Sequence, residues 1–98
     1  MMNSVMLTND GAREIASPGE EESLIRIAYQ LMINRGITRK RELRIDKNNV
    51  TEFGYTILEV DLDKIGYSLS QHSKSLIESI ARDGRSVNIM LGLKITIF

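Results

Sequence analysis

Residues Ser86–Phe98 read SVNIMLGLKITIF, and apolar side chains recur at every second position from Val87 to Ile97. A period of two places one set of side chains on a single face of a β-strand. We therefore predict a long terminal strand with one buried face. A strand this apolar must pair within a sheet, because an unpaired one would be a template for aggregation.

A helix is predicted well before this strand, over residues 18–35. Ser17, Pro18 and Glu20 form a capping-box arrangement with proline at the first helical position, and apolar residues follow at helical spacing. Gly36 is expected to end the helix as a left-handed cap. The apolar surface extends beyond one face, which indicates packing on two sides, against the N-terminal segment or another copy of the chain.

A second helix is predicted immediately before the terminal strand. Ser68, with Gln71 three residues later, is one candidate N-cap, and Ser70 is the other. A narrow apolar stripe follows, and Gly84 is expected to close the helix.

The region between the two helices predicts a hairpin. Residues 38–46 alternate apolar and charged side chains, residues 46–49 carry a turn signal, and residues 50–62 resume the alternation. Gly54 is a candidate for a bulge in the second strand.

The first sixteen residues carry only weak periodicity, with a turn signal at Asn9-Asp10-Gly11. We interpret residues 1–16 as a partly ordered arm and residues 17–98 as a single domain. The predicted fold is α+β: a small, largely antiparallel sheet of three to four strands with two helices packed on one face, in the order (arm)-α-β-β-α-β. The predicted core consists of apolar residues from both helices and all strands: Leu24, Ile27, Leu31, Leu43, Ile45, Leu58, Val60, Leu62, Leu76, Ile77, Ile80, Val87, Ile89, Leu91, Leu93 and Ile95.

The length, charge and amino-acid content of the chain exclude several classes of function. Ninety-eight residues form one domain, and a formal net charge of zero gives no overall attraction to nucleic acid or anionic membranes. The chain has no cysteine, which excludes disulfides, thiolate catalysis and cysteine-ligated zinc. No apolar stretch is long enough to span a membrane, and no signal peptide is recognisable, so we expect a cytoplasmic protein without a membrane partner.

One segment of the chain is strongly basic. Between positions 35 and 47, only Glu42 and Asp46 oppose six cations: Arg35, Arg39, Lys40, Arg41, Arg44 and Lys47. Several cations together can bind phosphates or carboxylates. No aromatic residue is interleaved for base stacking, and no DNA-binding spacing is present. The segment is therefore either a solvated edge strand guarded by charge or a surface for nucleic acid or an acidic partner.

An acidic group follows at Glu59, Asp61 and Asp63. Paired carboxylates can act as general acid and base or bind a divalent cation. No histidine or glycine-rich loop lies nearby in the sequence, so an exposed strand face is the favoured interpretation. Pairing between the basic and acidic strands would account for both groups as a salt-bridge ladder.

No constellation of catalytic residues is recognisable. His72 is the only histidine, and its place in the first turn of a helix predicts an exposed side chain. The seven glycines form no phosphate-binding motif. We therefore expect no enzymatic activity, no cofactor and no metal.

These observations favour a small protein-interaction module, such as a regulator, adaptor, inhibitor or immunity-type protein, that binds a partner protein. The alternative is a nucleic-acid-binding regulator that uses Arg35–Lys47. We separately expect a homodimer, formed through the terminal strand or the first helix.

Overall fold

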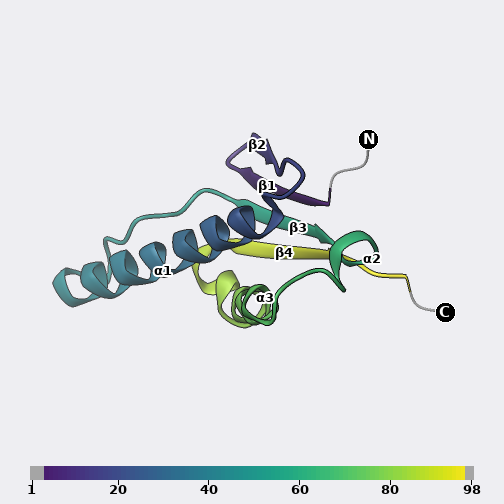
Figure 1. Cartoon of the computed structure of the whole chain (residues 1–98). Helices are drawn as coiled ribbons and strands as arrows, with labels where there is room; N and C mark the ends of the chain where they lie inside the picture. Colours follow the sequence, from purple (N-terminus) through teal and green to yellow (C-terminus); the bar gives the residue numbers. More distant parts are fainter. Residues whose placement is uncertain (1–3, 97–98) are drawn as a thin grey trace.

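The computed structural model describes residues 4–96 (Figure 1). Its elements in chain order are β1 (Val5–Asn9), β2 (Ala12–Ile15), α1 (Glu21–Ile45), β3 (Thr56–Asp61), α2 (Leu62–Ile65), α3 (Gln71–Asp83), the 3-10 helix η1 (Gly84–Val87) and β4 (Ile89–Lys94).

The four strands form one sheet in the order β2-β1-β3-β4. β1 pairs antiparallel with β2 and with β3, whereas β3 and β4 are parallel. Parallel neighbours cannot be joined by a tight turn, and here α2 and α3 supply the crossover connection. The prediction of an α+β fold with a largely antiparallel sheet is confirmed.

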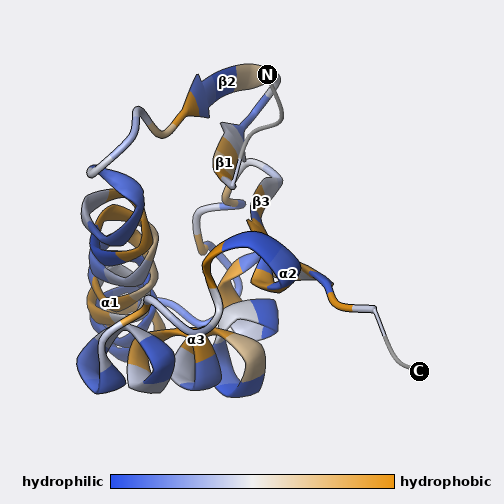
Figure 2. Ribbon diagram, turned by 45° about the vertical axis from the view of Figure 1, so that its right-hand side comes forward, coloured by the Kyte–Doolittle hydropathy of each residue, from blue (hydrophilic) through white to orange (hydrophobic). Residues whose placement is uncertain are grey.

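The two long helices pack on the same face of the sheet (Figures 1 and 2). Alternate residues of β1, β3 and β4, such as Val5, Leu58 and Ile89, point into one core and meet the apolar sides of both helices. The helix residues of this core are Leu24, Ile25, Ala28, Met32, Leu76, Ile77 and Ile80. The other face of the sheet carries the intervening residues, including Met6, Ile57 and Glu59.

The segment interpreted as an arm forms the β1–β2 hairpin. Its turn places Asp10 at φ +52° and Gly11 at φ +87°, the positive-φ pair that a two-residue hairpin turn requires. The Asn9-Asp10-Gly11 turn signal was therefore correct. Because β1 also pairs with β3, the hairpin belongs to the main sheet.

The first helix differs from its prediction at both ends. It begins at Glu21, and Ser17 and Pro18 lie before it. The Glu21 carboxylate accepts a hydrogen bond from the backbone N–H of Gly19, at 2.6 Å, in place of the predicted cap. Gly36 does not stop the helix, because its φ is not positive and α1 continues through it to Ile45.

The predicted strand over residues 38–46 is wrong, and so is the predicted hairpin with residues 50–62. Most residues of the sequence TRKRELRI have good intrinsic helix propensity, which outweighs the short alternation of Leu43 and Ile45. The turn signal at Asp46 is correct but follows a helix: its side chain accepts the N–H of Asn48. The next strand is β3, which begins only at Thr56, so Gly54 lies in the connection and not in a bulge.

The remaining elements follow the sequence closely. Ser70 caps α3, because its hydroxyl accepts the backbone N–H of Ser73, while Ser68 lies outside the helix. Gly84 has right-handed backbone angles and leads into η1. The left-handed turn is at Asn88, with φ +63°, so the terminal strand starts at Ile89 and not at Ser86. The strand ends at Lys94, so the predicted continuation is wrong for Ile95 and Thr96, and its last two residues, 97 and 98, lie outside the described residues.

The core prediction is partly right. Eleven of its residues pack in the core: Leu24, Leu58, Val60, Leu76, Ile77, Ile80, Val87 and Ile89 are buried in full, and Leu31, Leu62 and Leu91 in part. Leu43 and Ile45 are exposed because α1 carries them past the sheet, and Ile27, Leu93 and Ile95 are also exposed. The structure adds residues that the weak pattern near the N-terminus concealed, above all Val5 and Leu7.

Candidate functional site

The predicted basic segment lies on the C-terminal half of α1 and in the turn after it. In Figure 1 this half of α1 extends beyond the strands, and the connection that follows runs back toward β3. The structure divides the six cations into two groups. Arg35 and Arg39 turn toward the body of the fold, whereas Lys40, Arg41, Arg44 and Lys47 are exposed.

Arg35 is a buried structural residue, with only 7 % of its surface exposed. Its Nη1 donates to the carbonyl of Val87 at 2.9 Å and to that of Asn88 at 3.5 Å. Its Nη2 donates to Thr56 Oγ1 at 2.9 Å and to Asn9 Oδ1 at 3.3 Å. One guanidinium therefore ties α1 to β1, to β3 and to the end of η1, just before β4. Burial lowers the pKa of Arg35, because desolvation disfavours its charge.

Arg39 holds the connection after α1 in place. Its guanidinium lies 5.1 Å from the centre of the Phe53 ring, and Arg35 lies 5.3 Å from the same ring. Arg39 Nη2 also donates to the carbonyl of Thr51. The Glu42 carboxylate accepts both the backbone N–H and the hydroxyl of Thr51, and these bonds lower the pKa of Glu42. Residues 51–53 are thereby fixed against α1.

The four outward-facing cations share the end of α1 with exposed apolar side chains. Ile37, Leu43 and Ile45 are 52 %, 48 % and 80 % exposed. We call this surface the basic end of α1, and it consists of Ile37, Lys40, Arg41, Leu43, Arg44, Ile45 and Lys47. Such a mixture of cations and apolar groups can attract an acidic surface and then exclude water from part of the contact.

The proposed ladder between the basic and acidic segments does not form. The basic residues lie on a helix, so no strand carries them beside β3. The strands that flank β3 are β1 and β4. The two charged groups need separate explanations.

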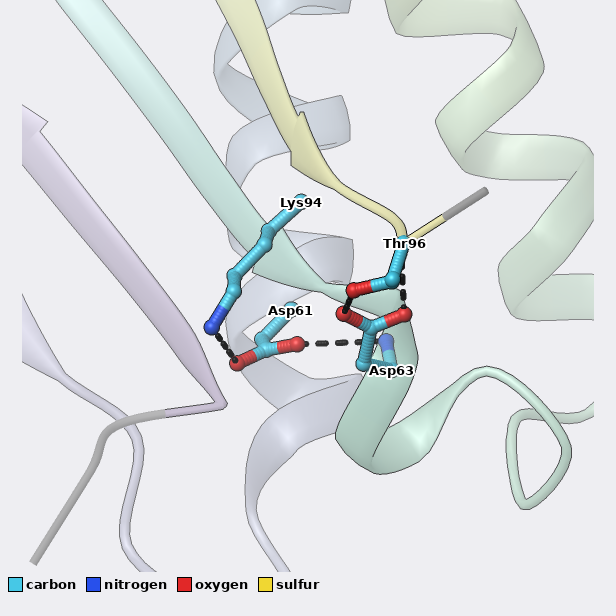
Figure 3. Close-up of polar contacts among 4 residues, drawn as sticks. All are labelled: Asp61, Asp63, Lys94 and Thr96. Carbon is cyan, nitrogen blue, oxygen red and sulfur yellow. Dashed lines mark hydrogen bonds and ion pairs between the residues drawn. The ribbon is translucent and has the colours of Figure 1, made fainter. Parts of the chain in front are cut away.

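The acidic residues are divided between two elements (Figure 3). Glu59 is exposed on β3. Asp61, at the end of β3, is buried instead of facing solvent: it accepts the N–H of Asp63 at 3.1 Å and lies 3.7 Å from Lys94 Nζ. Asp63 is in α2, where its carboxylate accepts the backbone N–H and the hydroxyl of Thr96 at 2.8 and 2.6 Å. Asp61 and Asp63 thus fix the end of β4 to α2.

The Asp63 contact predicts a specific pH dependence. The hydroxyl and then the N–H of Thr96 hold the pKa of Asp63 below its usual value, because both bond the ionised form. The resulting stability is fully present above about pH 4, the range of an unfolded aspartate, and is lost as the pH falls through the lower folded pKa. Asp63→Asn should therefore lower the melting temperature at neutral pH, and the difference from the wild type should shrink in acid.

Thermal melts followed by circular dichroism over a series of pH values would measure this difference. The companion variant Thr96→Val removes the hydroxyl donor and should reproduce the pH-dependent part of the loss. A melting difference that stays constant across the acid range would show that the ionised carboxylate is not the stabilising form.

The remaining titratable residues do not gather into a metal-binding group within the part of the chain that the structure describes. Within residues 4–96, no three histidine, aspartate or glutamate side chains lie together as metal ligands would. His72 is exposed in the first turn of α3. Over the same residues, no helix combines the length and the apolar character needed to cross a bilayer.

Several residues that shape this region had no signal in the sequence. Asn9, Thr51, Phe53, Thr56 and Asn88 lie outside the basic segment in the sequence, and each contacts Arg35, Arg39 or Glu42 in the fold. Asn88 supplies one further bond, from its side-chain amide to the carbonyl of Phe53. No protein-family model, curated protein or solved structure matches this chain.

Proposed function

We propose that this chain is a non-enzymatic interaction module that binds an acidic protein partner through the basic end of α1. The observation that carries the proposal is the exposure of Ile37, Leu43 and Ile45 among Lys40, Arg41 and Arg44 on a helix end that extends beyond the sheet. Apolar side chains held in water at a rigid position are typical of a surface that another protein covers.

The rigidity of this surface supports the proposal. Arg39, Glu42, Thr51 and Phe53 brace the extended half of α1 from its inner side. A braced helix loses little conformational freedom when it binds, and this favours affinity. The inner residues therefore hold the helix, and the outer cations are available to a partner.

The same geometry weighs against nucleic acid as the ligand. Phosphates would use the cations but gain nothing from Ile37, Leu43 or Ile45. The Phe53 ring is covered by the guanidinium groups of Arg35 and Arg39, at 5.3 and 5.1 Å from its centre, so the face that they cover is closed to a stacked base. The nucleic-acid-binding regulator stays as the second candidate, because four exposed cations on one helix end can contact a phosphate backbone.

Charge reversal tests the proposal. Arg41→Glu/Arg44→Glu should weaken capture of the partner from a native lysate by about a hundredfold or more in Kd, because like charges across an interface cost several kcal/mol. The matched control is Arg13→Glu/Arg26→Glu, which makes the same change in net charge at two exposed sites elsewhere. The control should retain the partner. Equal retention by both variants would remove the basic end from the binding surface.

The neutral substitution Ile37→Ser separates the two candidate functions. It removes an exposed apolar contact without changing charge, so it should weaken a protein partner about tenfold and leave binding to nucleic acid unchanged. Nucleic-acid binding is measured with labelled duplex DNA and single-stranded RNA by fluorescence anisotropy at about 50 and 200 mM salt. Tight, salt-sensitive binding that Ile37→Ser does not alter would support the second candidate over the first.

A further inference from the structure

The two edges of the sheet are protected very differently. β2 is four residues long, fully exposed, and carries Arg13 and Glu14. β4 has the sequence IMLGLK, with no proline and no charge before Lys94 at its end. Charged, short edge strands resist pairing with other chains, and uncharged ones invite it. By this criterion β2 is protected from pairing with another chain, whereas β4 is not, and we call β4 the open edge.

A groove runs along the open edge, between β4 and α3, and its lining is apolar chiefly near the end of β4. One part, of about 540 Å³, is lined by Ile80, Ala81, Arg82, Arg85 and the β4 residues from Ile89 to Leu93. A second part continues past Leu93 to Ile95, beside Tyr67, Lys74, Ile77 and Glu78. Leu93 lines both parts and is 45 % exposed, and Tyr67 is 85 % exposed. The groove therefore extends along most of the strand.

The charged side chains along this groove differ between its two ends. Arg85 lies near the start of β4, and Glu78 lies near its end, one helical turn from Lys74. Both side chains are exposed, and neither takes part in an ion pair within residues 4–96, whereas the nearby Arg82 pairs with Asp83 at 3.2 Å. An antiparallel copy of the same strand would bring the start of one β4 beside the end of the other. Arg85 of each copy would then face Glu78 of its partner.

From this edge, its groove and the order of its charges, we propose that a second copy of this chain binds here, with the two β4 strands paired antiparallel about a two-fold axis. The pairing joins two four-stranded sheets into one continuous sheet. In this register the exposed Leu93 of each copy lies opposite the first half of the other copy's β4, and the two α3 helices lie on the same face of the joined sheet. A two-fold contact uses the same patch on both copies. This interface lies on a different element from the basic end of α1, so the proposal does not depend on the proposed function.

The mass in solution tests the pairing. Light scattering coupled to gel filtration should give twice the mass of one chain, falling toward one chain on dilution. Leu93→Lys should raise the dissociation constant at least about tenfold, because an ammonium group would lose water at the seam. The matched control is Ile37→Lys, which makes the same change at a similarly exposed site on α1 and should leave the dimer intact.

A charge swap identifies the geometry without altering an apolar residue. Glu78→Arg and Arg85→Glu should each weaken the dimer, and the double variant should restore it, because the pair is re-formed with its signs exchanged. A wild-type chain that stays monomeric at all concentrations would overturn the proposal. A dimer that Leu93→Lys leaves intact, or that the double variant fails to restore, would place the contact elsewhere.

Discussion

Replacement of Arg35 by methionine is expected to lower the free energy of unfolding by about 3 kcal/mol. Methionine fills part of the space but donates no hydrogen bond. The carbonyl of Val87, 2.9 Å from the guanidinium, then loses its donor in the interior, and the hydroxyl of Thr56 keeps only its bond to Asn9 Oδ1. Each buried polar group left without a partner costs about 1–3 kcal/mol. The variant removes one member of a network and leaves the others, which is the costly way to alter buried polar groups.

Urea denaturation followed by circular dichroism would measure the loss. The matched control is Arg26→Met, on the exposed side of the same helix, which should change stability by no more than about 0.5 kcal/mol. Equal effects of the two substitutions would show that the Arg35 network contributes nothing to the stability of the fold.

Leu58→Ala is expected to cost about 2–5 kcal/mol, through lost burial and the cavity that remains. Leu58 is fully buried at the centre of β3, beside Leu7 of β1 and Leu91 of β4. The matched control is Leu43→Ala, at a leucine that is 48 % exposed on α1. It should cost less than about 1 kcal/mol. A large loss in Leu43→Ala would indicate that residues 38–46 pack in the core, as the strand interpretation required.

Local patterns predicted the parts of the fold where the sequence had one strong signal. The alternation from Ile89 to Lys94, the serine cap at Ser70 and the Asp10-Gly11 turn all correspond to observed features. β1 was missed as a strand because Val5 and Leu7 provide only two buried positions in five residues. Its place in the sheet depends on pairing with β3, far along the chain, and no local pattern encodes that.

The end of α1 shows how tertiary contacts override a local pattern. Gly36 resembles a stop signal, and residues 42–45 alternate as a strand would. The helix continues because residues 38–45 have good helix propensity, and Arg39 and Glu42, one turn apart, also bind residues 51–53 of the returning connection. Those partners lie about ten residues away in the sequence. Helix periodicity is judged from residues three or four apart, so it does not reveal these contacts.

The sequence predicted only part of the candidate site, for the same reason. The density of cations between positions 35 and 47 marked the segment, but it assigned no separate role to Arg35. Its burial depends on acceptors contributed by three other segments, at Asn9, Thr56 and Val87. The division into inner and outer cations follows from the helical period once the helix is known to reach Ile45, since Arg35 and Arg39 then lie one turn apart on the inner face.

The central claim is that a partner protein contacts the basic end of α1, and site-specific photo-crosslinking tests it most directly. A photoreactive amino acid replaces Arg44 in one variant and Arg26 in another, and each is irradiated in native lysate. Both residues are exposed on the same side of α1, about 27 Å apart along its axis. We predict an adduct with another protein from position 44 and none from position 26. Equal adducts from both positions, or an adduct from position 26 alone, would contradict the account.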